Sequence, residues 1–367
     1  MTLPPLAQIP PQIAAVADYE AYARERMTPA AWSYFSGGAA DELTLHDNVA
    51  AFRRIRLHSR VLRDVAGGDT RLTLLGEAFD YPILLAPIAF QKLAHRDGEF
   101  ASVLGASAMK AGMIVSTQAS VPLEALAQAS QTRLWFQLYL QHDRDFTAQL
   151  VRRAEAAGYR ALVVTVDAPV NGARNREQRD GFALPAGVEA INLRGMAAVP
   201  VHAGEAGGSP LFGTTLLDGA PTWDDVAWLR SLTALPILLK GILSPDDARR
   251  AVDAGASALV VSNHGGRTLD TLPASVDALP AIARAVQGRI PLLLDGGIRR
   301  GTDVLKALAL GADAVLVGRP YIHALASAGA VGVAHVLHLL RAELEMAMAL
   351  TGCRTLADID ASVIWPD

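Results

Sequence analysis

The segment Ser262-Asn263-His264-Gly265-Gly266-Arg267 combines residue types that can transfer a proton and hold a small acid. A histidine that titrates near neutrality can accept a proton, and an arginine three residues later can bind a carboxylate through two hydrogen bonds. Asp167 ends an apolar run earlier in the chain and offers a carboxylate that can orient the imidazole and stabilise its charged form. A lone loop histidine is more often a surface or hydrogen-bonded residue, but the glycines and Arg267 beside His264 favour acid–base chemistry.

Two glycine–arginine segments further along the chain have the composition of a phosphate site. They are Asp295-Gly296-Gly297-Ile298-Arg299 and Gly318-Arg319, and each follows an apolar run. Glycines let backbone N–H groups approach an oxyanion, and arginines add bidentate pairing. The pattern predicts a bound phosphate group without indicating which phosphate compound carries it.

Lys240 and the single cysteine, Cys353, limit the remaining chemistry. At the end of an apolar run, Lys240 can be a Schiff-base nucleophile, a fixed charge beside an anionic cofactor, or the partner of a buried carboxylate. One cysteine excludes an intramolecular disulfide and a thiolate metal cluster, and we expect Cys353 to be a small buried hydrophobe. No metal site is expected, because the histidines and carboxylates show no H-E-x-x-H or comparable ligand spacing.

Short apolar runs recur along the chain at the spacing of strands that alternate with helices. Each is apolar on both faces, as buried parallel strands are. The runs are 83–89, 113–117, 134–139, 161–167, 237–241, 258–263, 292–296 and 314–318, with helical stretches at 98–111, 123–129, 146–157, 245–254, 276–286 and 302–310. The pattern predicts an α/β fold, a closed (β/α)8 TIM barrel, in which polar residues at the ends of the runs meet at one face. An open doubly wound sheet is the competitor, but no G-x-G-x-x-G follows the first run.

Two segments lie outside this repeat, within what we expect to be a single domain of residues 1–367. Residues 1–80 form an N-terminal extension with helices at 18–27 and 29–35. A hairpin in the extension, turning at Gly67-Gly68, should plug the bottom of a barrel that spans 81–350. Residues 168–222 form a Gly-, Pro- and Ala-rich connection far longer than usual, which predicts an active-site loop or lid above the strand ends.

The composition excludes several classes of protein. Hydrophobic residues make up 51% and charged residues 19%, which excludes a disordered chain, and a net charge of −4 offers no basic surface to nucleic acid or anionic lipid. The first residues carry prolines and no basic stretch typical of a signal peptide, so we expect a cytoplasmic protein. Residues 320–340 lack acidic and basic side chains and are long enough to span a bilayer, but we interpret them as a buried helix pair rather than a membrane anchor.

These motifs occur together in one known family. From Tyr34 to about Cys353, the sequence resembles the FMN-dependent α-hydroxy acid oxidase/dehydrogenase family, which includes enzymes that oxidise glycolate, lactate and mandelate. The resemblance rests on the segments Tyr34-Phe35-Ser36-Gly37-Gly38-Ala39, Ala86-Pro87-Ile88-Ala89, Phe136-Gln137-Leu138-Tyr139, Thr165-Val166-Asp167, Leu239-Lys240-Gly241, the loop from Ser262 to Arg267, and the stretch from Asp295 to Gly301.

The resemblance implies FMN as the cofactor and assigns residues to its parts. Lys240 would lie near N1 and O2 of the isoalloxazine ring and stabilise the anionic reduced flavin. The ring itself would be held by Ala89, Ser116, Gln137 and Thr165, and the ribityl chain and phosphate by Asp295, Gly297, Arg299, Gly318 and Arg319. The implied cofactor-binding set is completed by Pro87, Ile88, Ser262 and Gly296.

The resemblance also implies the residues around the substrate. His264 would be the catalytic base, paired with Asp167, and Tyr139 would bind the substrate hydroxyl. The substrate carboxylate would be bound by Arg267, Arg174 and Tyr34.

One position departs from the glycolate oxidases within this family. Gln118 stands where those enzymes have a tryptophan. A smaller, polar side chain there would open the pocket to substrates larger than glycolate, either a medium-length aliphatic or an aromatic 2-hydroxy acid.

The implied reaction is oxidation of an S-2-hydroxy acid to the 2-oxo acid, with O2 reduced to H2O2. A dehydrogenase that uses quinone or another acceptor is one alternative, and a non-catalytic flavin-binding barrel is another. Residues 186–221 of the long connection are small and near neutral, which favours an enzyme that works without a membrane. A homotetramer is expected by analogy with the family alone.

Overall fold

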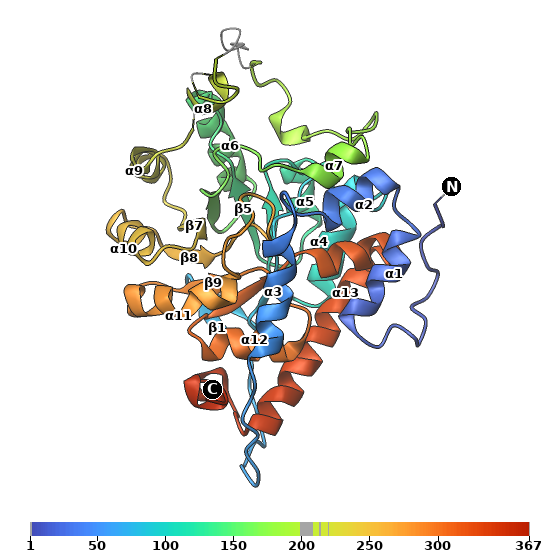
Figure 1. The fold of residues 1–367 in the computed structure, drawn as a ribbon, viewed down its shortest axis with the longest axis vertical. Coiled ribbons are helices and arrows are strands. Elements are labelled where there is room, and N and C mark those ends of the chain that lie inside the picture. The colour runs from blue at the N-terminus through green and yellow to red at the C-terminus, as the bar shows by residue number, and fades with distance from the viewer. Residues whose placement is uncertain (1, 199–207, 213, 219, 367) are drawn as a thin grey trace.

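The core of the protein is a closed barrel of eight parallel strands, which confirms the predicted (β/α)8 fold (Figure 1). The computed structural model describes residues 2–198, 208–212, 214–218 and 220–366. Each predicted apolar run coincides with one strand, and β10 closes the barrel onto β3. The strands are β3 (Ile83–Leu85), β4 (Met113–Ser116), β5 (Leu134–Leu138), β6 (Leu162–Thr165), β7 (Ile237–Ile242), β8 (Ala258–Val261), β9 (Leu292–Leu294) and β10 (Ala314–Val317).

Side chains alternate along these strands between two hydrophobic clusters. Leu84, Ile114 and Trp135, with their equivalents on the other strands, form a cluster inside the barrel. Their neighbours, such as Ile83 and Val115, belong to the larger cluster between the barrel and the surrounding helices. Because both faces of every strand are buried, the runs are apolar throughout. Closing the sheet also leaves no unpaired strand edge.

A two-stranded hairpin closes the end of the barrel at which the strands begin. It pairs β1 (Leu72–Leu74) with β2 (Glu77–Phe79), and both Leu74 and Phe79 join the interior cluster. The hairpin therefore plugs the barrel, as predicted, but its turn lies at Leu75-Gly76 and not at Gly67-Gly68. The earlier glycines precede Asp69, which bridges to Thr355 near the C-terminus, so the chain there pairs with a distant segment rather than with itself.

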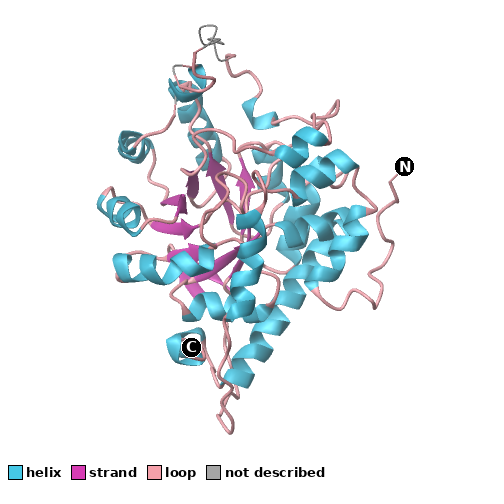
Figure 2. Ribbon diagram, viewed as in Figure 1, coloured by secondary structure: helices cyan, strands magenta, loops and turns pink. Residues whose placement is uncertain are grey.

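Helices surround the barrel as an outer layer (Figure 2). Six of them match predicted stretches to within about three residues at each end, a usual uncertainty for helix ends. These six are α4 (Glu99–Ala108), α5 (Leu123–Ala129), α6 (Arg144–Ala156), α10 (Pro245–Asp253), α11 (Ser275–Val286) and α12 (Gly301–Ala309). The layer also contains α9 (Trp223–Leu232), which precedes β7 and was not predicted.

The long helix α13 (Arg319–Thr351) is the buried helix pair predicted for residues 320–340. Non-helical backbone at Ala328 and Gly329 divides it into two. Within the described residues, it is the one helix long and apolar enough to cross a membrane, with a mean hydropathy of 1.5 over its 18-residue window. Of that window 61% is buried inside the protein, where α13 packs against α1, α4 and α12. That packing is typical of a core helix.

The N-terminal extension and the long connection after β6 meet above the barrel mouth. The extension contains α1 (Tyr19–Arg24) and α2 (Pro29–Ser36), close to their predicted ranges, and α3 (Leu43–Arg54), which was not predicted because its buried face includes the polar side chains of Thr44 and Asn48. The connection contains α7 (Asn175–Arg179), η3 (Ile191–Leu193) and α8 (Thr215–Asp218). Helix α7 packs against α2, so the two segments together form a roof over the strand ends.

Candidate active site

A cavity of about 750 Å³ opens where the barrel strands end. Nineteen of the twenty-one predicted site residues line it: Tyr34, Pro87, Ile88, Ala89, Ser116, Gln118, Gln137, Tyr139, Thr165, Arg174, Lys240, His264, Arg267, Asp295, Gly296, Gly297, Arg299, Gly318 and Arg319. The other two, Asp167 and Ser262, lie behind the wall and bind His264 and Lys240. The predicted set therefore gathers at one place, at the barrel face where (β/α)8 enzymes carry their sites.

The histidine and aspartate form a hydrogen-bonded couple that is largely shielded from solvent. His264 Nδ1 lies 2.8 Å from Asp167 Oδ1, and the backbone of His264 adopts a left-handed conformation with φ of 57°. Asp167 in turn packs against Gly241, where a Cβ would clash with the carboxylate side chain. With Nδ1 held as a donor to the carboxylate, Nε2 is the nitrogen left to accept a proton.

Burial and charge set the protonation of this couple. Burial lowers the pKa of His264 below the ordinary value for histidine, and only part of that effect is reversed by Asp167. Burial alone would raise the pKa of Asp167, but His264 and Lys240 outweigh it and hold the carboxyl pKa below its usual value. At neutral pH the couple is therefore a neutral imidazole beside a carboxylate, which is the state required of a base.

This arrangement predicts the acid limit of catalysis. Because protonated His264 cannot accept a proton and its pKa is lowered, kcat/KM should fall with decreasing pH only below the ordinary histidine range. Asp167→Asn removes a charge that raises the pKa of His264, so the acid limb should move to still lower pH while the maximal rate decreases. A pH profile of flavin reduction in both proteins checks this; an acid limb above the ordinary histidine pKa would contradict it.

Lys240 is a fixed positive charge with a buried partner. Its Nζ lies 3.1 Å from Asp295 Oδ2 and donates a hydrogen bond to Ser262 Oγ at 3.0 Å. Burial would lower the pKa of Lys240, but Asp295 and Asp167 outweigh it and raise the pKa instead. A permanently charged amine is a poor nucleophile, so of the three alternatives the geometry favours a cation paired with a carboxylate beside an anionic group.

A chain of side-chain hydrogen bonds crosses three neighbouring strands below the cavity. Ser116 Oγ donates to Gln137 Oε1 at 3.1 Å, and Gln137 Nε2 donates to Thr165 Oγ1 at 3.0 Å. All three residues are buried, so each fixes the orientation of the next. The network presents hydrogen-bonding groups of β4, β5 and β6 to the cavity in set positions.

Two half-buried arginines, Arg299 and Arg319, also line the cavity, and we call them the phosphate arginines. Within the described chain neither has a carboxylate within ion-pair distance; Arg319 donates instead to the carbonyls of Phe35, Gly37 and Gly265. Burial lowers the pKa of both arginines, and the nearby cations Arg267 and Arg299 lower the pKa of Arg319 further. Buried charges are costly unless paired, so this end of the cavity is built for an anion.

Two glycines just before Arg299 are required by packing, in addition to the predicted contact of their backbone with phosphate. Gly296 and Gly297 have φ of 92° and 90°, a region that favours glycine. A Cβ on Gly297 would clash with the backbone oxygen of Asn48 in α3. The segment is thus shaped by close contact with the N-terminal extension, in addition to any contact with phosphate.

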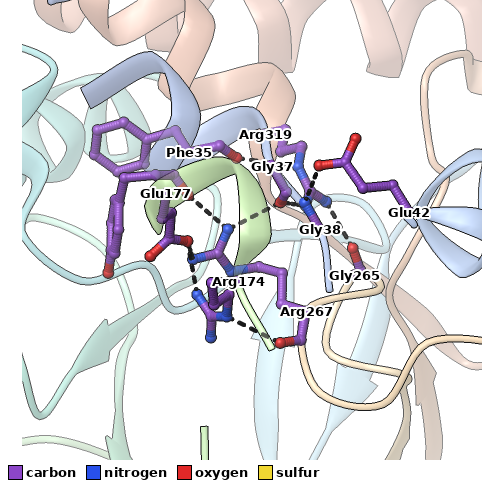
Figure 3. Close-up of polar contacts among 10 residues, drawn as sticks. Phe35, Gly37, Gly38, Glu42, Arg174, Glu177, Gly265, Arg267 and Arg319 are labelled. Carbon is purple, nitrogen blue, oxygen red and sulfur yellow. Dashed lines mark hydrogen bonds and ion pairs between the residues drawn. The ribbon is translucent and has the colours of Figure 1, made fainter. Parts of the chain in front are cut away.

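Arg174 and Arg267, which we call the clamp, lie close together in the wall of the cavity (Figure 3). Tyr34 lines the same cavity. Arg174 Nε donates to the carbonyl of Arg267 at 3.0 Å, and the Arg267 guanidinium lies 5.1 Å from the centre of the Tyr34 ring. Burial raises the pKa of Tyr34 to about 12, although the nearby arginines oppose it, so its hydroxyl remains a hydrogen-bond donor. The clamp and this hydroxyl together suit a carboxylate.

Among the lining residues that sequence analysis did not single out, three contact the clamp or Tyr34. Phe182 stacks on Tyr34 with ring centres 4.8 Å apart, and Phe90 lies edge-on to the same ring at 6.0 Å. Glu177 accepts hydrogen bonds from both clamp arginines. Its position three residues after Arg174 is the spacing of a helical ion pair, a signal that could have linked the two.

A profile of the FMN-dependent dehydrogenase family matches residues 23–366. The chain belongs to this family. It is 50% identical over 353 residues to an L-lactate oxidase of Nostoc sp., covering 95% of this chain and 96% of the relative. It is 44% identical over 356 residues to the glycolate oxidase of Spinacia oleracea, covering 97% of this chain and 96% of that one.

Solved structures support the same family. A mandelate oxidase with (S)-2-phenylpropionate superimposes on this FMN-dependent dehydrogenase fold with a TM-score of 0.86. The two are 41% identical, and the match covers 96% of this chain and 98% of the other.

FMN is the cofactor of this FMN-dependent dehydrogenase family, and the residues present fit it. Asp295 Oδ1 is buried and has no hydrogen-bond partner within the described chain, which suits a ribityl hydroxyl. The phosphate arginines suit the FMN phosphate, and Lys240 with the Ser116–Gln137–Thr165 network suits the polar edge of the isoalloxazine ring. The cavity volume leaves room for a small acid beside the ring.

Proposed function

We propose that the protein oxidises an S-2-hydroxy acid to the corresponding 2-oxo acid and reduces O2 to H2O2, with FMN as the cofactor. The observation that carries this proposal is the His264–Asp167 couple, which opens onto the same cavity as the arginine clamp. A base and a carboxylate site on one cavity hold the substrate so that its C2 hydrogen and hydroxyl face the reacting groups. The relatives named as lactate, glycolate and mandelate oxidases support the same reaction class.

Each of the site residues would have its own role in the reaction. The clamp binds the substrate carboxylate, Tyr139 donates a hydrogen bond to the hydroxyl, and His264 Nε2 accepts a proton. Asp167 stabilises the imidazolium that results, and Lys240 supplies positive charge where negative charge develops on the cofactor. FMN, when bound, would supply the acceptor for the two electrons and the remaining proton that the substrate loses. Helices α2 and α7 pack against each other and contribute Tyr34 and Glu177 to the wall of the cavity.

The electron acceptor separates this proposal from a dehydrogenase that uses quinone. In air, each 2-oxo acid formed should be matched by one H2O2, and an artificial dye should add little to the rate. Turnover with dye alone and no H2O2 would favour the dehydrogenase.

The expectation that the enzyme works without a membrane rested on the composition of residues 186–221. That segment includes residues 199–207, 213 and 219, which lie outside the described residues.

The side wall near Gln118 supports a substrate larger than glycolate. Gln118 lines the cavity together with the apolar side chains of Phe90, Phe182 and Leu211. We propose a medium-length aliphatic or an aromatic 2-hydroxy acid, because this surface can cover an apolar substrate chain.

Substituting Gln118 tests the substrate proposal. Gln118→Trp should fill this part of the cavity and lower kcat/KM for bulky 2-hydroxy acids by about tenfold or more, while glycolate is affected less. Comparing glycolate, lactate, 2-hydroxyhexanoate and mandelate in both proteins measures the shift. A parent enzyme that prefers glycolate to all larger acids would refute the proposal.

We also propose that the protein works in the cytoplasm as a homotetramer. Support for assembly comes from apolar side chains exposed on two adjacent helices, Phe100 and Leu104 of α4 and Val331 of α13. The single cysteine suits a reducing compartment. Light scattering of the FMN-loaded protein gives the oligomeric state directly, and a monomer at micromolar concentration would contradict the tetramer.

A further inference from the structure

Glu177 places a carboxylate in the clamp that the reaction itself does not use. Its Oε1 accepts a hydrogen bond from Arg174 Nη1 at 3.0 Å and another from Arg267 Nη2 at 3.1 Å (Figure 3). The Glu177 side chain is 13% exposed and lines the cavity. An internal carboxylate therefore bridges the two guanidinium groups expected to bind the substrate.

The charges that line the cavity fall into three groups. Lys240 is neutralised by Asp295. The phosphate arginines carry two positive charges and have no ion-pair partner in the described chain, which matches the nearly two negative charges of a phosphate monoester. The two clamp arginines and Glu177 together carry a net charge of +1. That remaining charge matches one carboxylate.

Contacts around Glu177 hold it in this position. Its neighbours on the same segment are tied to the N-terminal extension, since Arg176 pairs with Glu42 and Asp180 accepts a hydrogen bond from Ser33. Arg174 Nη2 and Arg267 Nε form no hydrogen bonds to the part of the chain that the structure describes. A substrate carboxylate can use these donors while Glu177 stays in place.

We propose that Glu177 is a specificity-determining residue that sets the clamp to accept one carboxylate, so that the enzyme selects 2-hydroxy monoacids over 2-hydroxy diacids. The proposal rests on the oxidase function given above. A second carboxylate on the substrate would enter a cavity that already holds the Glu177 charge, and like charges repel strongly where water is largely excluded. Specificity of this kind arises from a repulsive group directed against the wrong substrate.

Glu177→Gln tests the proposal because it removes the charge and keeps the size of the side chain. (S)-2-hydroxybutyrate and (S)-malate are a matched pair of substrates, since malate replaces a methyl group with a carboxylate. The ratio of kcat/KM for malate to that for hydroxybutyrate should rise by about tenfold or more in the variant. Glu177→Asp should keep the parent ratio.

A control and a second measurement isolate the effect. Glu189→Gln removes a negative charge from the same connection but not from the clamp, because Glu189 pairs with Arg194 on the surface, and it should leave the ratio unchanged. Butyrate and succinate, which cannot be oxidised by this reaction, should perturb the flavin absorbance on binding. Succinate should gain affinity relative to butyrate in Glu177→Gln by a similar factor.

The outcomes separate this proposal from the function on which it rests. If no hydroxy acid reduces the parent protein, the oxidase function fails, whatever the succinate and butyrate titrations give. Suppose instead that hydroxy acids reduce the parent flavin. If Glu177→Gln then changes the malate-to-hydroxybutyrate ratio of kcat/KM and the succinate-to-butyrate ratio of affinities by less than about twofold, the proposed charge selection is wrong. An equal weakening of malate, hydroxybutyrate, succinate and butyrate would show that Glu177 only positions the arginines.

Discussion

His264→Asn is expected to keep its FMN and to lose flavin reduction by substrate by about a thousandfold or more. Asparagine can still donate a hydrogen bond to Asp167, whose carboxylate would otherwise be left without its partner in the wall of the cavity. It cannot accept the proton, so the step that releases electrons from C2 loses its base. Stopped-flow mixing with substrate in the absence of air measures the rate of flavin bleaching.

Two controls show whether the loss is chemical. His338→Asn changes an exposed histidine of α13 outside the site. Substrate should reduce the flavin of this variant at the parent rate. A 2-oxo acid should bind to His264→Asn nearly as tightly as to the parent, because the clamp is intact. Reduction of His264→Asn at more than about a tenth of the parent rate would remove His264 from the role of base.

Arg299→Met is expected to weaken FMN binding by about a hundredfold while stabilising the protein without cofactor. In the absence of an anion, Arg299 is a half-buried cation whose side chain, within the described residues, donates a hydrogen bond only to the carbonyl of Ile298, and burial lowers its pKa. Replacing it with an apolar side chain removes that cost but also removes a partner of the phosphate. The two effects therefore have opposite signs.

Thermal unfolding with and without FMN, combined with an FMN titration, measures both effects. The Tm of the cofactor-free variant should exceed that of the cofactor-free parent, and the gain in Tm on adding FMN should shrink. Arg300→Met is the matched control, because Arg300 pairs with Glu343 away from the cavity and should change neither quantity greatly. Unchanged FMN affinity in Arg299→Met would show that this arginine does not bind the phosphate.

The barrel and most of its site were predictable because parallel strands buried on both faces leave a plain pattern. Most runs carry a polar residue at or near their end, such as Ser116 or Lys240, whose burial would be costly without a partner at the strand ends. Family motifs then added Tyr34 and Arg174, which lie outside the strands and carry no periodic signal.

The features that sequence analysis missed depend on contacts between distant segments. Helix α3 buries Asn48, which bonds to Asn263 of the histidine loop, so the helix lacks a clear apolar stripe. Glu177 meets Arg267 across 90 residues of chain, and no local pattern encodes that approach. The predicted position of the hairpin turn was wrong for the same reason, because the segment at Asp69 pairs with the C-terminal region and not with a neighbouring strand.

Anaerobic titration of the FMN-loaded protein with a series of S-2-hydroxy acids tests the central claim most directly. At least one acid should bleach the flavin completely at one equivalent, yield the 2-oxo acid, and allow the yellow colour to return with H2O2 when air is admitted. A protein that binds FMN but is bleached by none of these acids would contradict the account.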